Sequence, residues 1–262
     1  MLGVVIAFLF GLAYGSFLNV VILRFDDLQS IAKDRSHCPN CKTQLSWWDL
    51  VPLFSFAYLQ GKCRYCKKPI SWQYPIVELL TAVLVAASYY LLFTSQNLVM
   101  WQSIVGMISL IIVIGSMMTI LVHDLTEMMV PDLMSNLLLG ASIVFTLVVH
   151  HDPLGLLYSA LVGFLPIMLL VLPSRGKWMG EGDIKIAGAL AILVNWPNAV
   201  AFLILTFLLG GIFGSVALAT KRVKMKTAVP FGPFLIIASI IILFWGDSIT
   251  SWYLGTIGYG YY

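Results

Sequence analysis

Long apolar runs, separated by shorter polar stretches, constrain this 262-residue chain more than any other feature. A run of about 18 or more apolar residues can cross the ~30 Å hydrocarbon core of a bilayer as an α-helix. A transmembrane β-barrel would instead alternate apolar and polar residues in segments of about ten. The sequence therefore predicts an all-α polytopic membrane protein with about eight transmembrane helices, at residues 4–23, 76–93, 101–122, 133–150, 154–172, 184–194, 198–219 and 230–245.

The composition excludes a soluble globular protein of this length. Hydrophobic residues make up 60% of the chain and charged residues only 10%, whereas a typical soluble domain is about 25% charged. Two runs are less regular than the others. The run at 184–194 is short, and we expect it to be tilted, broken or extended across 195–197. The run at 4–23 lacks a preceding basic region and a following cleavage site, so we expect it to remain as a helix.

The basic residues predict the orientation, because all 15 Lys and Arg residues fall in three groups between the runs. With eight crossings the three groups lie on one side, which the positive-inside rule makes cytoplasmic, with both termini outside. The net charge of +3 then reflects topology and not nucleic-acid binding. The groups are Arg24, Lys33, Arg35, Lys42, Lys62, Arg64, Lys67 and Lys68; Arg175, Lys177 and Lys185; and Lys221, Arg222, Lys224 and Lys226.

All four cysteines lie in the only long polar segment, residues 24–75. Cys38 and Cys41 form one C-x-x-C pair, and Cys63 and Cys66 form a second. Two such pairs at this separation can supply four thiolates to one structural Zn²⁺. A reducing cytoplasm argues against disulfides, although free or redox-active thiols are an alternative. We predict a closed zinc site that stabilises a small cytoplasmic insertion between the first two helices.

Two aspartates are predicted at the cytoplasmic edge of different helices. The third run ends near Asp124 and the sixth begins just after Asp183. Ionisable groups at such positions are candidates for function. Two nearby carboxylates tend to share one proton, so the ionised one can activate water while the protonated one polarises a peptide carbonyl. Alternatively, Asp183 merely favours the positive end of a helix dipole and Asp124 is a solvated residue past a helix end.

Five motifs, in order, resemble those of the type IV prepilin leader peptidases, which are membrane aspartyl proteases with a G-x-G-D element. The resemblance covers nearly the whole chain and implies a location in the bacterial cytoplasmic membrane. It divides the chain into a first helix (1–23), a four-cysteine zinc-binding domain (24–75) and a transmembrane aspartyl protease core (76–262). The motifs are "GLAYGSFLNVVILR" (11–24), the cysteine segment (38–78), "HDLTEMMVPD" (123–132), "MGEGDIKIAGALA" (179–191) and "VPFGPFL" (229–235).

The resemblance implies that Asp124 and Asp183 are the catalytic pair and that the substrates are type IV prepilins or pseudopilins, cleaved after a glycine. Where the family usually has an apolar residue before the first aspartate, this chain has His123. The residues expected to contact substrate are Gly180, Gly182, Lys185, Pro230 and Gly232. The two glycines beside Asp183 would let a substrate backbone approach closely.

Many members of the family also methylate the new N-terminus with S-adenosylmethionine. The retained cysteine segment favours this second activity here, although no glycine-rich nucleotide loop is visible. The residues that would serve it are Asn19, Arg24 and Glu78.

Two other classes of function remain as alternatives. A proton- or cation-coupled transporter could use Asp124 and Asp183, but it should need carboxylates near the middle of the bilayer. A non-catalytic scaffold for pilus or secretion assembly could use the cysteine module to dock a partner, but it gives no reason for two acids on separate helices.

Overall fold

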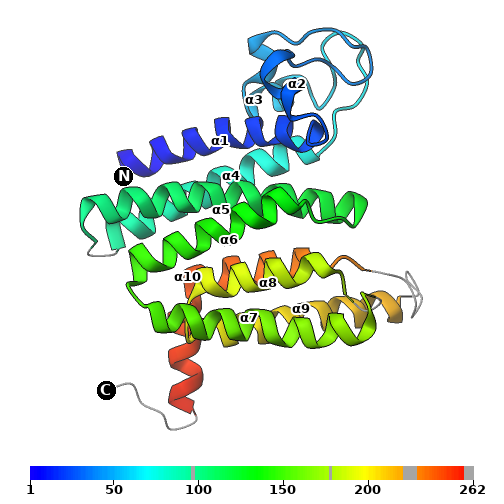
Figure 1. Cartoon of the computed structure of the whole chain (residues 1–262). Coiled ribbons are helices and arrows are strands. Elements are labelled where there is room, and N and C mark those ends of the chain that lie inside the picture. Colours follow the sequence, from blue (N-terminus) through cyan, green and yellow to red (C-terminus); the bar gives the residue numbers. More distant parts are fainter. Residues whose placement is uncertain (96–97, 177–178, 221–228, 257–262) are drawn as a thin grey trace. The chain divides into compact units, whose positions relative to one another are not determined.

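The structure is a computed structural model that describes residues 1–95, 98–176, 179–220 and 229–256, and these are almost entirely helical (Figure 1). Seven helices within these ranges are long and apolar enough to cross a membrane. This confirms the predicted fold class of an all-α, multi-pass membrane protein. The chain divides into two compact units, Met1–Ser103 and Ile104–Tyr262. Five basic residues used to predict the orientation lie outside the described residues: Lys177, Lys221, Arg222, Lys224 and Lys226.

In the first unit, two antiparallel helices pack along their length, α1 (Leu2–Leu23) and α4 (Gln73–Tyr90), the latter continued by a π-helical turn η2 (Leu91–Ser95). Glycines on α1 allow the close approach. A Cβ atom at Gly11 would lie 2.6 Å from the Cα of Ala82, and one at Gly15 would lie 2.7 Å from the Cα of Glu78. One turn further along, the side chain of Asn19 donates to the carbonyl of Tyr74 at 3.2 Å.

The polar insertion connects α1 to α4 and lies at the end of these helices away from the N-terminus (Figure 1). It holds three short helical segments, α2 (Leu28–Lys33), the 3₁₀ turn η1 (Trp47–Leu50) and α3 (Phe54–Tyr58). Arg24, just after α1, closes its first loop by donating to the carbonyls of Ser30 at 2.8 Å and Asp34 at 2.9 Å.

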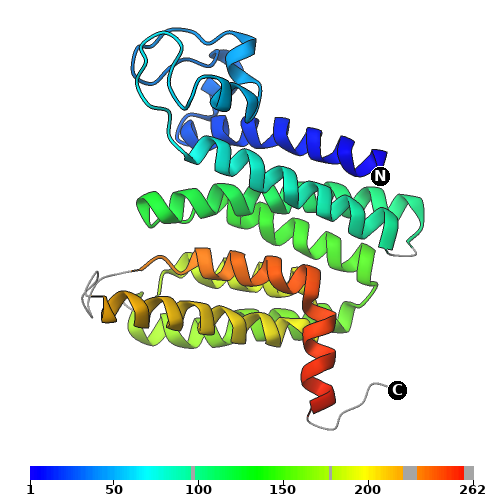
Figure 2. The ribbon, with the colours of Figure 1, turned by 180° about the vertical axis from the view of Figure 1, so that it is seen from behind.

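The second unit holds the remaining helices around a short inner helix, α8. All residues of α8 from Ile186 to Val194 are buried, and it packs against α6, α7, α9 and α10 (Figures 1 and 2). A helix that is apolar on all sides is expected to be buried in this way. The helices are α5 (Met100–Glu127), α6 (Asp132–Phe145) with the π-helical turn η3 (Thr146–His150), α7 (Pro153–Ser174), α8 (Glu181–Val194), α9 (Asn198–Ala219) and α10 (Gly232–Thr256).

The predicted crossing at 184–194 therefore forms a helix, but one that is not among the seven long candidates. Its 14 residues span about 21 Å at ~1.5 Å per residue, which is less than the ~30 Å apolar thickness of a bilayer. The short apolar run has a physical reason: α8 is enclosed by protein and does not have to match the lipid.

The register of α7 against α8 shows that the start of α8 is recessed. A Cβ atom at Gly163 would meet Ala187 and Ala191, and one at Gly155 would meet Asn195, so the two helices run antiparallel. Extending this pairing places Asp183 roughly six residues, or about 9 Å, short of the end of α7. The two helices therefore leave a step at this end of the unit.

Substitution at Gly163 tests this packing. In Gly163→Ala the new methyl group would lie 2.6 Å from the Cβ of Ala191 and 2.8 Å from the carbonyl oxygen of Ala187. We expect it to lower the free energy of unfolding by about 1–3 kcal/mol. The control is Gly140→Ala on α6, where the added methyl meets nothing within 4 Å. Alanine favours a helix over glycine by up to ~1 kcal/mol, so this variant should be no less stable than wild type. Reversible unfolding in detergent measures both, and equal losses would contradict the packing.

Candidate functional site

The four cysteines converge in the first unit. Their Sγ atoms all lie within 4.8 Å of one another, and those of Cys38 and Cys66 are 3.9 Å apart. A tetrahedral zinc site with Zn–S bonds of ~2.3 Å requires sulfur atoms about 3.8 Å apart. The cluster therefore has the donor type, the number of ligands and the approximate spacing of a structural zinc centre, as predicted.

Each cysteine pair lies on the same kind of turn. The N–H of Cys38 and that of Cys63 each donate to a carbonyl five residues later, at 2.9 Å. The residue after the second cysteine takes the left-handed conformation in both turns, with φ of 58° at Lys42 and 61° at Lys67. Two equivalent turns facing one another direct four thiols toward one point.

Asp49 ties the segment between the pairs to the second turn. Its carboxylate accepts from Arg64 Nε at 2.7 Å, from the hydroxyl of Tyr65 at 3.2 Å and from the Ser46 hydroxyl at 2.8 Å. Burial alone would raise the pKa of Asp49, but the hydrogen bonds from Ser46 and the charge of Arg64 outweigh it, so the pKa lies below its usual value. This depressed pKa adds stability above the unfolded-state pKa of Asp49, and that stability is lost as the pH falls through the folded-state value.

Asp124 lies near the end of α5, where it is buried. Its Oδ2 accepts a hydrogen bond of 3.0 Å from the backbone N–H of Gly232, the first residue of α10. A Cβ atom at position 232 would lie 2.6 Å from this oxygen. Gly232, which was expected to contact substrate, therefore lies directly against the carboxylate and admits no side chain.

Asp183 is the third residue of α8 and is also buried. Its Oδ2 accepts from the N–H of Gly180 at 3.1 Å, so the carboxylate caps its own helix. The neighbouring Gly182 packs on the segment after α5, since a Cβ there would lie 2.6 Å from the Cβ of Val130. Val130 follows Asp124 by six residues, so this packing places the start of α8 beside the segment that continues from Asp124.

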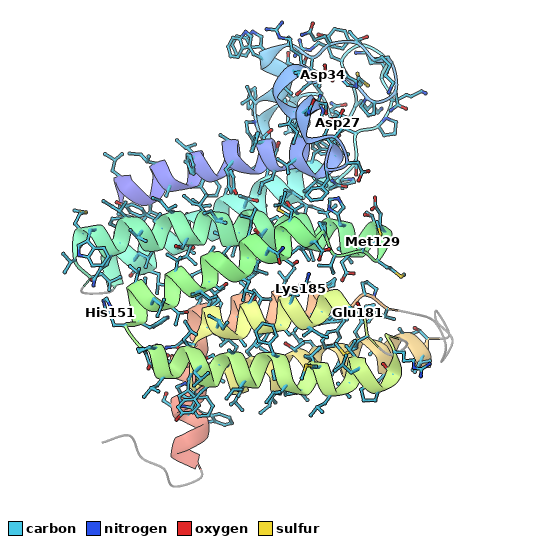
Figure 3. The ribbon with its side chains drawn as sticks, viewed as in Figure 1. Asp27, Asp34, Met129, His151, Glu181 and Lys185 are labelled. Atoms are coloured by element: carbon cyan, nitrogen blue, oxygen red, sulfur yellow. The ribbon has the colours of Figure 1, made fainter. Side chains whose placement is uncertain are left out.

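Lys185 lies one turn beyond the start of α8, and its Nζ donates to Asp132 Oδ1 on α6 at 2.6 Å. Lys185 and Glu181 both lie at the start of α8, and Met129 lies at the same end of the unit, whereas His151 lies at the opposite end (Figure 3). The ammonium group of Lys185, which was expected to contact substrate, is thus paired with Asp132. Pro230, also expected to contact substrate, is half-buried just before α10.

His123 is buried beside Asp124 in the sequence. Its Nδ1 lies 2.9 Å from the carbonyl oxygen of Thr119, one turn earlier on α5. A carbonyl oxygen can only accept, so Nδ1 carries the proton in this contact. The ring is thereby fixed along its own helix.

The three residues named for methyl transfer lie in the first unit. Glu78 Oε2 accepts from the N–H of Leu53 at 2.8 Å. Asn19 is buried, and its Oδ1 has no hydrogen-bond partner among the described residues. Arg24 is instead committed to the carbonyls of the insertion. Asn19 and Glu78 thus form a buried polar region between α1 and α4.

Sequence reasoning did not identify Val130 or Leu53, which position Gly182 and Glu78 through contacts that no sequence motif indicates.

Comparison with known proteins identifies the family. Residues 9–92 match the model of the bacterial peptidase A24 N-terminal domain, and residues 111–215 match that of the type IV leader peptidase family. The chain is 33% identical to the prepilin leader peptidase/N-methyltransferase of Aeromonas salmonicida (strain A449), over 96% of this chain and 94% of the relative. It is 32% identical to the enzyme of that name from Bacillus subtilis (strain 168), over 95% and 97%.

The protein of the same name from Legionella pneumophila is 32% identical, over 94% of this chain and 93% of its own length. No solved structure matches the chain. The helical membrane fold and the matches to both peptidase family models define a multi-pass membrane peptidase. Because similarity to these relatives extends over almost the full length, the chain belongs to the type IV leader peptidase family.

Removal of two thiols tests the zinc centre. In the double variant Cys38→Ser, Cys41→Ser we expect the loss of about one zinc ion per chain, because two ligands cannot hold a closed tetrahedral site. Elemental analysis of protein purified under reducing conditions measures the metal, and limited proteolysis should show a more readily cleaved insertion. A Lys42→Ala variant, which keeps all four thiols, should retain its zinc. Wild-type protein without zinc would contradict the assignment.

Proposed function

We propose that this chain is a membrane aspartyl endopeptidase that removes the short leader of type IV prepilins or pseudopilins, cleaving after a glycine. Asp124 and Asp183 form its catalytic pair. The observation that carries the proposal is the placement of two buried carboxylates at the end of α5 and the start of α8. Gly182, next to Asp183, packs on Val130 in the segment that follows Asp124. Membership of the leader peptidase family supports the same activity.

The chemistry follows from the hydrogen bonds of the pair. Each carboxylate accepts one backbone N–H through Oδ2, from Gly232 and from Gly180 respectively. These bonds fix both groups and leave Oδ1 of each for water and for a shared proton. The ionised member takes a proton from water, the water attacks the peptide carbonyl, and the protonated member donates to the carbonyl oxygen. The resulting gem-diol then collapses and the C–N bond breaks. The carboxyl group that took the proton from water gives it to the leaving amine, and the other carboxylate takes a hydroxyl proton back, so the pair returns to its starting state without a covalent intermediate.

The step beside Asp183 supplies room for the substrate. Because Asp183 lies about 9 Å short of the end of α7, we propose that an extended peptide reaches the carboxylates without unfolding a transmembrane helix. We place this end on the cytoplasmic side, with both chain termini outside, on the basis of the positive-inside rule. A prepilin carries its basic leader there, next to the apolar segment that anchors it in the membrane.

The second proposed activity is methylation of the new N-terminus by S-adenosylmethionine, as the names of the relatives suggest. The donor would supply a methyl group on a positively charged sulfur. The buried acceptor oxygens of Asn19 and Glu78 fit a cationic ligand, whereas Arg24 serves the fold. No observation favours a transporter or a non-catalytic scaffold.

Single substitutions of the pair test the peptidase activity. Asp124→Asn and Asp183→Asn should each lower the rate of prepilin cleavage at least ~1000-fold, since residues that act as a unit fail together. Asp132→Asn is the matched control, because Asp132 lies at the same end and its side chain pairs with Lys185. It should keep the rate within about threefold. Mass spectrometry of a prepilin peptide incubated with purified protein measures cleavage, and retention of full activity by either Asn variant would remove that residue from the mechanism.

Glu78→Gln separates methylation from cleavage. Glutamine keeps an oxygen that can accept from Leu53 N–H but removes the negative charge, so binding of a cationic methyl donor should weaken. We expect at least tenfold less methylated product, with cleavage within about twofold of wild type. The mass of the processed N-terminus and calorimetric binding of S-adenosylmethionine report the effect. Unchanged binding and methylation would exclude Glu78 from this role.

A further inference from the structure

The segment Trp47–Tyr58, called here the aromatic segment, is unusually apolar for a water-exposed insertion. It reads WWDLVPLFSFAY, yet neither η1 nor α3 contains a single buried residue. Trp47, Trp48, Phe54 and Tyr58 are 65%, 57%, 64% and 70% exposed. Exposed apolar surface of this kind marks a site of interaction with another molecule or a membrane.

Hydrogen bonding fixes the depth of this segment along the transmembrane helices of its own unit. The N–H of Leu53, which precedes α3, donates to Glu78 Oε2 at 2.8 Å. Glu78 belongs to the candidate membrane span Gln73–Thr94 and lies five residues, or about 8 Å, inside its start. The beginning of α3 is therefore level with the first turns of a membrane span.

A second contact holds α3 at the same level. The ring of Phe56 packs against that of Trp72, with centroids 5.0 Å apart, and Trp72 immediately precedes α4 and is 69% exposed. Exposed apolar residues continue from there along one face of α4, at Ile76, Leu79, Leu80 and Val83. The exposed apolar side chains around Trp72 thus lead directly into the surface that α4 offers to lipid.

The charge next to the aromatic segment suits the same environment. Lys62, Lys67 and Lys68 follow it within ten residues and are exposed, whereas Arg64 is paired with Asp49 of the segment itself. Tryptophan and tyrosine concentrate at the interface between hydrocarbon and water, and clustered lysine and arginine are attracted to anionic headgroups.

We infer that the aromatic segment inserts into the headgroup layer of the bilayer and binds an anionic lipid surface, so that the zinc-binding insertion rests on the membrane. The depth set by Leu53 and Glu78, the continuity with the apolar face of α4 and the adjacent cations all favour lipid as the occupant. The apolar helix of a substrate would fit the exposed rings, but it would not require the cations. This inference depends only on the membrane fold and not on the proposed peptidase activity.

Photocross-linking of the full-length protein in nanodiscs tests the inference. Benzoylphenylalanine is placed singly at Phe54 or Tyr58, two exposed aromatic positions, and at Asn40 as a matched control. Asn40 is exposed on the first cysteine turn, outside the aromatic segment. Zinc content verifies that each variant retains its insertion. Nanodiscs contain either phosphatidylcholine alone or a mixture with phosphatidylglycerol, and mass spectrometry identifies the adducts with and without a prepilin peptide.

We expect at least fivefold more lipid adduct from positions 54 and 58 than from position 40, and at least twofold more with phosphatidylglycerol than without it. Lipid adducts that are no more frequent than at position 40 would overturn the inference. So would adducts to another part of the chain in place of lipid, or lipid adducts that the prepilin peptide replaces with its own. The last result would assign the aromatic segment to substrate.

Discussion

The contact between the N–H of Gly232 and the carboxylate of Asp124 is the point on which the second unit is organised. It joins the end of α5 to the start of α10 through a buried hydrogen bond from a backbone N–H to a carboxylate. Loss of such a bond destabilises a protein more than loss of a hydrogen bond between neutral groups. The absence of a Cβ atom at position 232 permits it. On the other side of the pair, Gly182 lets α8 approach Val130 and brings Asp183 to the same site. Glycines here allow the close packing that positions each carboxylate.

The short inner helix explains how a membrane protein can cut a peptide bond with water. A full-length lipid-facing helix would carry its first residues to the membrane surface or beyond. Helix α8 is enclosed by its neighbours, so it can cross without matching the full thickness of the bilayer, and it starts below the end of α7. Asp183 is thereby recessed from the end of α7. In the first unit the buried carboxylate of Glu78 also accepts a backbone N–H, that of Leu53, and so links the insertion to α4.

Most of the helices could be predicted from apolar run length, because satisfying the backbone in lipid leaves few alternatives to a helix. The cysteine cluster was predicted from the spacing, since two C-x-x-C turns at this separation can supply four thiolates to one metal ion. Topology predicted that Asp124 and Asp183 lie at one edge of the membrane, and the family resemblance predicted that they act as a pair. What the sequence could not provide was the register between helices, which depends on glycine contacts such as Gly163 with Ala191. For the same reason it could not identify Gly232 as the donor to Asp124 or Leu53 as the donor to Glu78.

Infrared spectroscopy can observe the shared proton itself. In purified protein near neutral pH, the pair should give a C=O stretching band of one protonated carboxyl group that shifts in heavy water. The band should be lost or displaced in Asp124→Asn and also in Asp183→Asn, since each removes one partner of the same proton. A spectrum in which neither substitution alters any protonated carboxyl band would mean that the two acids titrate independently, and the site would then not be an aspartyl protease dyad.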